Sequence, residues 1–359
     1  MTSQIIARAD DGVGHLTLDR PRALNALGYD MLGEIADTLA AWRDDPTVRV
    51  LLLDGAGDRG FCAGGDIREL YAQVVAGRRG DAHLYFRREY AVDVAVAESP
   101  VPVVAIMDGI TLGGGVGLSG HATVRVVTER SRVAMPETRI GFTPDVGGSW
   151  LLARAPGCLG EHLALGAVTM DGADAVHAGL ADHFVPSERL DLLRSDLVAL
   201  AVAGVDPLDD EAVHEVARLH SIEPPPSALA ARQARVDRCY AGATVPEIVE
   251  RLRDAARAGD EAAGAEADQL GTLSPTAVTV ALAGVRAARS LPDLRAALTQ
   301  EYGLVTWFVD TQPDLVEGIR AQVVDKDRNP RWAPATLADV DEHVGDVALA
   351  YVPDVPLWG

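Results

Sequence analysis

The sequence predicts an α/β protein with a helical C-terminal part. In the first half, short β-rich segments bounded by glycine or proline alternate with helical patterns. From about residue 228 onward the chain is rich in alanine, leucine, arginine and glutamate and carries few strand signals. Strands that alternate with helices are typical of a layered α/β architecture, so we expect such a domain to be followed by helices.

The expected elements follow in chain order. Residues 14–18, 48–53 and 101–107 are β-rich segments bounded by glycine or proline, and we expect each of them to be a strand. Between the first two segments, apolar residues recur at helical spacing from Leu32 to Leu39, with Asp30 as the expected N-cap.

The composition also predicts three regions. Residues 1–203 form the expected core with the active site, 204–227 a linker that ends in three prolines, and 228–359 a helical domain and tail. We expect the final segment, 325–359, to run over the surface because it is rich in turn formers.

The charge and the cysteines narrow the class of protein. The 359 residues include 53 acidic and 32 basic side chains, a formal charge of −21, which argues against nucleic acid and anionic membranes as partners. Cys62, Cys158 and Cys239 are odd in number and widely spaced, so they predict neither a disulfide framework nor a zinc cluster. We find no export signal and no run of 18 apolar residues in the sequence, so we expect a soluble cytoplasmic protein.

Two glycine-rich turns are the strongest chemical signal. FCAGGD at 61–66 and GGGVG at 113–117 each follow a β-like segment and precede a helical pattern. Backbone N–H groups at a helix start attract negative charge, and glycine lets a ligand approach the backbone closely. If the amides of Gly65 and Gly114 converge, they form an oxyanion hole; the simpler alternative is that both turns serve packing alone.

The two turns, together with DRPRALNAL at 19–27, resemble the enoyl-CoA hydratase/isomerase (crotonase) superfamily over residues 5–185. The resemblance implies a ClpP/crotonase spiral of ββα units, with the acyl thioester carbonyl bound by the two amides. It places coenzyme A, as part of the substrate, beside Ala23 and the first turn. Ala23, Ala63, Gly64 and Asp66 are therefore substrate-binding candidates, although the simplest role of Asp66 is to cap the next helix.

The positions of the acidic residues distinguish the different reactions of this superfamily. Hydratases use two glutamates across one water; the first of those positions is Gly117 here, and the second is Glu137. The segment from Pro136 to Gly148 adds Asp145, and its PET and FTPDVGG motifs are similar to the 3-hydroxyisobutyryl-CoA hydrolase subfamily. Similarities at 86–90, 274–276, 301–302 and 317–327 extend the resemblance over nearly the whole chain.

This resemblance implies a hydrolase of a short, branched 3-hydroxyacyl-CoA thioester in valine breakdown. A carboxylate near a thioester carbonyl either attacks it to form an anhydride or deprotonates a water, and a second acid protonates the leaving thiolate. We assign these roles to Glu137 and Asp145 and leave the two routes open. The resemblance makes Glu89 a candidate for binding the substrate hydroxyl, while Arg20, Arg22 and Arg68 are candidates for the CoA phosphates.

Other interpretations compete with this one. An enoyl-CoA hydratase/isomerase is the main alternative, and a CoA-binding module without activity is a second. The G-x-G-x-x-G match at 115–120 is weak as a dinucleotide site, because the preceding strand is expected to end near Met107. His214, Glu215 and His220 have the wrong spacing for a zinc-protease helix, and Asp108, Ser119 and His121 lie too close in sequence for a known triad order.

We therefore expect no metal and no redox cofactor, because a thioester is already activated toward attack. Relatives in this superfamily commonly form trimers or dimers of trimers, so a homo-oligomer is one expected state.

Overall fold

The computed structural model describes residues 3–203 and 208–358. The chain forms two compact units that are interleaved along the sequence. The sheet unit comprises Met1–Gly65, Arg88–Ala134 and Met170–Ala230. The helical unit comprises Asp66–Arg87, Met135–Thr169 and Ala231–Gly359.

The sheet unit contains two sheets. The six-stranded sheet has the order β1 (Ile5–Asp10), β2 (Val13–Leu18), β3 (Val50–Gly55), β5 (Val103–Met107), β7 (Val124–Val127) and β9 (His183–Phe184). Only the β1–β2 pair is antiparallel among these described strands. The smaller parallel sheet has the order β4 (Gly60–Cys62), β6 (Ile110–Leu112) and β8 (Arg132–Ala134).

Successive strands alternate between the two sheets: β3 is followed by β4, β5 by β6 and β7 by β8. Each pair then leads into helix, which is the ββα repeat that the resemblance implies. The three predicted strands are confirmed as β2, β3 and β5. The continuous apolar runs in β3 and β5 reflect burial on both faces, as is usual for central parallel strands, whereas His15 and Thr17 of β2 are only partly buried.

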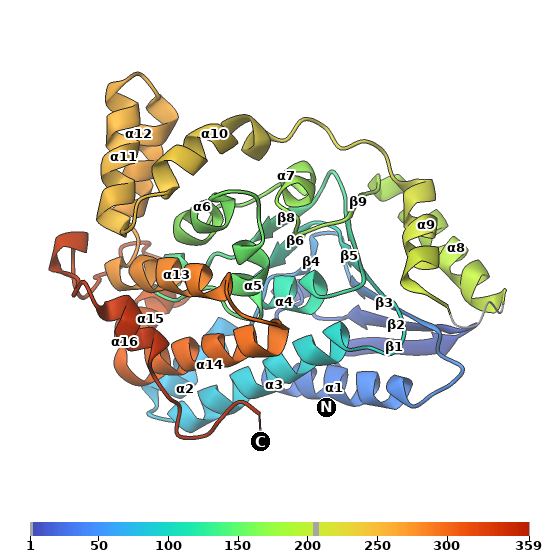
Figure 1. Cartoon of the computed structure of the whole chain (residues 1–359). Coiled ribbons are helices and arrows are strands. Elements are labelled where there is room, and N and C mark those ends of the chain that lie inside the picture. Colours follow the sequence, from blue (N-terminus) through green and yellow to red (C-terminus); the bar gives the residue numbers. More distant parts are fainter. Residues whose placement is uncertain (1–2, 204–207, 359) are drawn as a thin grey trace. The chain divides into compact units, whose positions relative to one another are not determined.

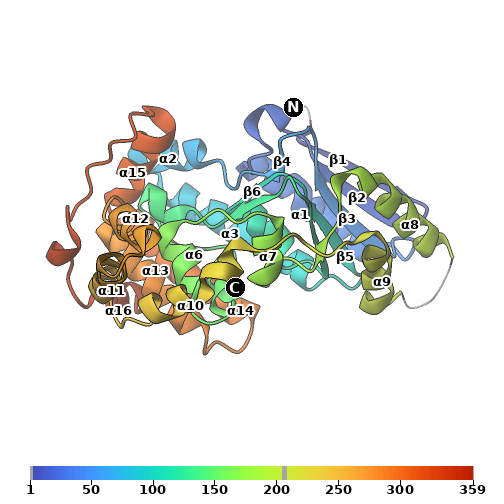
Figure 2. The same cartoon turned by 90° about the horizontal axis from the view of Figure 1, so that it is seen from above.

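The core of the sheet unit joins the large sheet to two helices. Side chains of the strands, including Val50, Leu52 and Val104, pack with apolar residues of α8 (Leu190–Val202) and α9 (Asp210–His220). Figure 2 shows α8 beside the strands of this sheet. The helical elements of the unit are η1 (Pro21–Ala23), α1 (Tyr29–Arg43), α4 (Gly114–Gly120), α7 (Gly172–His177), η3 (Ser187–Arg189), α8 (Leu190–Val202) and α9 (Asp210–His220).

The predicted helix between the first two strands is α1, but its N-cap is Gly28 and not Asp30. Asp30 lies in the first turn, where its negative charge still complements the positive end of the helix dipole.

The helical unit is built around α13 (Pro275–Ala288) and α14 (Leu294–Thr311). Both pack against α5 (Gly148–Ala153), and α13 also contacts α6 (Leu159–Gly166) (Figure 1). Its elements are α2 (Ile67–Val75), η2 (Glu137–Ile140), α5 (Gly148–Ala153), α6 (Leu159–Gly166), α11 (Val245–Arg257), α12 (Glu261–Leu270), α13 (Pro275–Ala288), α14 (Leu294–Thr311), α15 (Asp314–Ile319), the π-helix η4 (Arg320–Val324), η5 (Leu337–Asp339) and α16 (Val344–Leu349). Two helices, α3 (Arg79–Ala97) and α10 (Ala228–Tyr240), begin in one unit and end in the other.

The predicted domain division follows chain order, whereas the compact units group residues 135–169 with the C-terminal helices. Within the predicted linker, residues 210–220 form α9, and residues 204–207 lie outside the described part of the chain. Much of the predicted surface tail is exposed, but α16 packs on α13 and α14 and buries Ala348. None of the described helices is both long and apolar enough to cross a membrane.

Candidate active site

The first glycine turn joins β4 to α2 and lies directly against the second turn. Gly64 has φ +94°, a conformation that favours glycine, and a Cβ there would stand 2.8 Å from the Leu112 carbonyl oxygen and 3.3 Å from the Gly114 nitrogen. The Leu27 N–H donates to the Gly64 carbonyl at 2.9 Å, which ties the 24–27 segment to this turn. The sequence prediction that the two turns belong to one local structure is consistent with this packing.

The second turn places the Gly114 amide at the start of α4. Gly113 adopts φ +49° and donates its N–H to the Ala134 carbonyl, and α4 then begins at Gly114. A Cβ on Gly114 would stand 3.3 Å from the Gly65 nitrogen. Within the part of the chain that the structure describes, neither the Gly65 nor the Gly114 amide donates a hydrogen bond.

Glu89, on α3 within the sheet unit, lies at the same place. Its side chain is only 3% exposed, and its Oε1 atom occupies the space that a Cβ on Gly114 would need. A carboxylate at the positive end of α4 is electrostatically favoured. The sheet unit thus brings together three candidates: Gly65 in the first turn, Gly114 at the start of α4 and Glu89 on α3.

The loop that carries Ala23 is fixed by hydrogen bonds to its surroundings. The Asn25 side chain accepts from the Arg20 N–H and donates to the carbonyls of Gly60 and Phe61. Ala23 itself is exposed in η1, and Ala63 donates its N–H to the Leu24 carbonyl at 2.9 Å. Hydrogen bonds therefore connect residues 20–27 to residues 60–64.

Glu137 opens the short helix η2 and is 6% exposed, so it is not the surface residue that a lone glutamate after proline would be. Its carbonyl accepts the Phe142 N–H at 3.0 Å. The next residue, Thr138, donates its hydroxyl to the carbonyls of Ala164 and Leu165 on α6. These bonds hold the Glu137 backbone in place.

Asp145 lies on the turn that enters α5 and is 5% exposed. Its carbonyl accepts the Gly148 N–H at 2.6 Å, and the two residues that follow it, Val146 and Gly147, have φ +54° and +76°. A positive φ is uncommon for a β-branched residue such as valine. The helical unit thus carries both predicted carboxylates, each buried, eight positions apart on one segment of the chain.

Glu301 of α14 binds this turn and was singled out in the sequence only as part of the subfamily resemblance. It is fully buried; Oε2 accepts the Gly147 N–H at 2.6 Å, and Oε1 accepts the Ser149 N–H at 2.8 Å and the Ser149 hydroxyl at 2.5 Å. Burial raises the pKa of Glu301 to about 7, against the lowering effect of these hydrogen bonds. The sequence around Glu301 does not indicate this contact, because the partners are about 150 residues away in the chain.

Three candidates have other surroundings than the sequence suggests. Asp66 occupies the N-cap position of α2, but its side chain accepts no hydrogen bond from the first turn of that helix. The Arg68 guanidinium donates to the Val323 carbonyl, and the Arg20 guanidinium donates to the Ala26 carbonyl at 2.5 Å.

Cys62 is buried, and burial raises its pKa to about 12, so the thiol stays protonated near neutral pH.

The competing motifs form no other site in the described residues. Instead of a loop, the 115–120 motif lies inside α4, and residues 110–112, expected to separate it from a strand, are themselves strand β6. His214 pairs with His183 and His220 with Asp196, and among the described residues no group of three or more His, Cys, Asp or Glu side chains is arranged to hold a metal. The Ser119 hydroxyl donates to the Gly115 carbonyl and not to a histidine.

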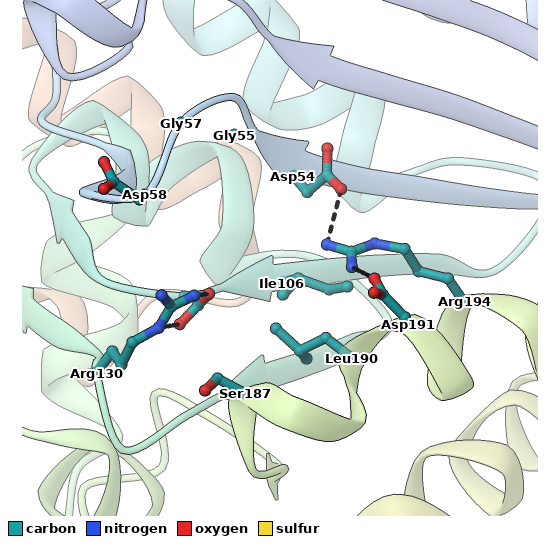
Figure 3. A pocket seen from close by; sticks show the side chains of 11 residues that line it. Asp54, Gly55, Gly57, Asp58, Ile106, Arg130, Ser187, Leu190, Asp191 and Arg194 are labelled. Carbon is teal, nitrogen blue, oxygen red and sulfur yellow. Dashed lines mark hydrogen bonds and ion pairs between the residues drawn. The ribbon is translucent and has the colours of Figure 1, made fainter.

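A polar pocket of about 210 Å³ in the sheet unit contains none of the predicted site residues. It is lined by Asp54, Gly55, Gly57, Asp58, Ile106, Asp108, Arg130, Ser187, Leu190, Asp191 and Arg194. Its two arginines are paired with aspartates: Figure 3 shows Arg194 with Asp54 and Asp191. Arg130 forms an ion pair with Asp108. Its positive charges are thus already neutralised.

Comparisons with known proteins agree with the fold and the motifs. The family model described as enoyl-CoA hydratase/isomerase matches residues 13–348. The mitochondrial 3-hydroxyisobutyryl-CoA hydrolase of Xenopus laevis is 39% identical over 331 residues, covering 92% of this chain and 84% of that protein.

Two crystal structures resemble the whole chain. One is described as a carnitinyl-CoA dehydratase from Mycobacterium thermoresistibile; it has a TM-score of 0.90 and 43% identity, and covers 99% of this chain and 98% of its own. The other is described as an enoyl-CoA hydratase from Rhodobacter sphaeroides 2.4.1; it has a TM-score of 0.87 and 39% identity, with 98% of both chains covered. The chain belongs to the enoyl-CoA hydratase/isomerase family and has the crotonase fold.

Proposed function

We propose that the protein is an acyl-CoA thioester hydrolase and that its substrate is 3-hydroxyisobutyryl-CoA. The observation that carries the proposal is the buried segment with Glu137 and Asp145, in a chain that has glycine at position 117. A hydratase with two glutamates needs a side chain at that position, whereas hydrolysis of a thioester needs a nucleophile or base and a proton donor.

The amides of Gly65 and Gly114 are the proposed oxyanion donors. Their approach to each other, and the absence of other acceptors for them among the described residues, support this role. As the thioester carbonyl is attacked, its oxygen becomes negative, and one such donor is worth roughly 3 kcal/mol of transition-state stabilisation.

Glu137 is the proposed attacking group or general base. In the direct route its carboxylate adds to the carbonyl carbon, the C–S bond breaks, and water then hydrolyses the anhydride. In the other route Glu137 takes a proton from water, and the hydroxide attacks. In both routes Asp145 gives a proton to the leaving thiolate, so the products are a carboxylic acid and free CoA thiol.

Glu89 is the proposed acceptor for the substrate hydroxyl. Its buried carboxylate lies beside Gly114 and can accept a hydrogen bond from a hydroxyl on carbon 3 of the acyl chain, which favours a 3-hydroxyacyl substrate. The Xenopus laevis relative, named for 3-hydroxyisobutyryl-CoA, supports the same choice, and with it a place in valine breakdown.

An enoyl-CoA hydratase/isomerase is the second candidate, because the two similar crystal structures are described as a dehydratase and a hydratase. The two candidates differ in the bond that changes. Hydration removes the conjugated double bond and leaves the thioester intact, whereas hydrolysis releases a thiol.

The test supplies 3-hydroxyisobutyryl-CoA and crotonyl-CoA in parallel. Free thiol and the absorbance of the conjugated double bond are followed in both reactions, with the Glu137→Gln variant as a control for background hydrolysis. We expect thiol release from the hydroxyacyl substrate only with the unaltered protein. Loss of the double bond without thiol would establish the second candidate, and tight CoA binding without either reaction would indicate an inert module.

The remaining assignments are proposals of the same kind. We expect no cofactor beyond the CoA of the substrate, no nucleic-acid or membrane partner, and a homo-oligomer as one state in solution. We also expect a cytoplasmic location, although the Xenopus laevis relative is named as mitochondrial.

A further inference from the structure

We propose that Glu301 is a positioning residue, which holds the turn around Asp145 in the geometry that the reaction needs. The inference rests on the proposed function, because it assigns Glu301 a role through Asp145. It concerns only contacts within the helical unit.

The turn itself has an unfavourable backbone conformation. Val146 and Gly147 both have positive φ, and Val146 is a β-branched residue, for which that region is sterically disfavoured. A short turn of this kind persists only where its surroundings impose it. Something outside the segment must therefore hold residues 145–149.

The α14 helix contacts the segment on both sides of Asp145. Before Asp145, the Phe142 ring meets the Phe308 ring edge to face, with 5.4 Å between centroids. After Asp145, Glu301 accepts the N–H groups of Gly147 and Ser149. Glu301 and Phe308 are two helical turns apart on α14, so one rigid element fixes both ends of the turn.

The chemistry of position 301 requires a carboxylate. The groups that face it are donors: the N–H groups of Gly147 and Ser149 and the Ser149 hydroxyl, with the Trp150 N–H beside them. A glutamine of the same shape would place its NH₂ against one of these donors, and an apolar residue would leave buried N–H groups without acceptors. A buried carboxylate is costly, and hydrogen bonds to the charged form offset part of that cost.

A contribution to stability alone is the competing explanation, and Asp174 provides the matched control. Asp174 is also buried, and its Oδ1 accepts a hydroxyl from Ser227 at 2.6 Å and an N–H from Leu229 at 2.8 Å. It lies in the sheet unit and carries none of the proposed chemistry. Asp174→Asn therefore disturbs the same kind of contact at a place remote in sequence from Asp145.

The experiment compares Glu301→Gln, Ser149→Ala and Asp174→Asn with the unaltered full-length protein. Melting temperature, kcat and KM for thiol release, and amide hydrogen exchange over residues 142–150 are measured for each. We expect Glu301→Gln to lower kcat about 10- to 100-fold with KM changed less than about threefold, because the turn shifts while the acyl-CoA contacts stay. Ser149→Ala keeps the two N–H bonds, so it folds and gives a smaller loss.

The control decides between position and stability. We expect Asp174→Asn to lower the melting temperature with kcat within about twofold of normal and with unchanged exchange over 142–150. Equal kcat losses in Glu301→Gln and Asp174→Asn, or normal exchange of the Gly147 and Ser149 amides in Glu301→Gln, would overturn the inference. If the unaltered protein releases no thiol, the proposed function is overturned. Hydrogen exchange needs no substrate, so it would still measure whether Glu301 holds residues 145–149.

Discussion

Glu89 places its Oε1 atom where a methyl group on Gly114 would have to stand. The glycine at this position is therefore required by a side chain and not by its own φ, since α4 has begun there. The contact connects the start of α4 to a buried acid on α3 and leaves the amide edge of Gly114 facing the first glycine turn.

Gly114→Ala is expected to lower kcat/KM about 100-fold, because the new Cβ displaces Glu89 and moves the amide by a fraction of an ångström. It should also destabilise the fold by about 1–3 kcal/mol through overpacking. Gly80→Ala is the control, since a Cβ there meets no atom within 4 Å. Combining Gly114→Ala with Glu89→Ala should recover part of the melting temperature; normal turnover in Gly114→Ala would remove this glycine from the chemistry.

Glu137→Gln and Asp145→Asn are each expected to lower kcat about 10³-fold with CoA affinity nearly unchanged, since each removes a group used in the transition state. Thiol release and calorimetric CoA binding measure the two effects separately. Glu250→Gln, which changes an exposed acid on α11, controls for the change in charge. Turnover close to normal in either site variant would place the acid–base chemistry on another residue.

The stability of the protein should depend on pH through Glu301. Its pKa is about 7 in the folded protein and near the ordinary 4.5 when unfolded, so the folded state holds a proton that the unfolded chain has lost. The free energy of unfolding should therefore fall as pH rises from about 4.5 to about 7, by up to about 3 kcal/mol from this group. Denaturant titrations from pH 5 to pH 8 should show a smaller decline in Glu301→Gln than in Asp174→Asn, and equal slopes would refute the assignment.

Gly141→Ala should destabilise the turn that follows Glu137. Gly141 has φ +70°, and a Cβ there would overlap the backbone of Asp314 in α15. Gly179→Ala isolates the conformational part, because Gly179 has φ +77° with open space around it. We expect about 1 kcal/mol from the φ angle in both variants and about 1–3 kcal/mol more in Gly141→Ala, measured by denaturant unfolding. Equal decreases in the free energy of unfolding of the two variants would mean that α15 moves to accommodate the new Cβ.

Cys62 should resist alkylation in the folded protein. Its pKa of about 12 leaves almost no thiolate at pH 8, and the side chain is buried. Peptide mapping after iodoacetamide treatment should find the partly exposed Cys158 labelled first and Cys62 only after denaturation. Rapid labelling of Cys62 together with loss of thiol release would indicate a nucleophilic cysteine.

Local patterns in the sequence predicted the central strands well. Residues 50–53 are apolar without interruption because this part of β3 is covered on both faces, and a run of this kind can be recognised from the local sequence alone. Strand β6 was missed, because three residues between Met107 and Gly113 are too few to show a period. The cap of α1 was misplaced by two residues, because Gly28 carries no side chain that marks a helix start.

The sequence by itself determined the family and the residue types of the proposed chemistry: two glycine turns, Glu137 and Asp145, with glycine at 117. These signals are local, since each lies in a few consecutive residues. Only the tertiary structure decided that Glu89 lies against Gly114 and that Glu301 binds the turn of Asp145, because those contacts join residues 25 and about 155 positions apart. No periodicity in the sequence reveals contacts over such separations. They form when elements pack together and bury an acid beside hydrogen-bond donors.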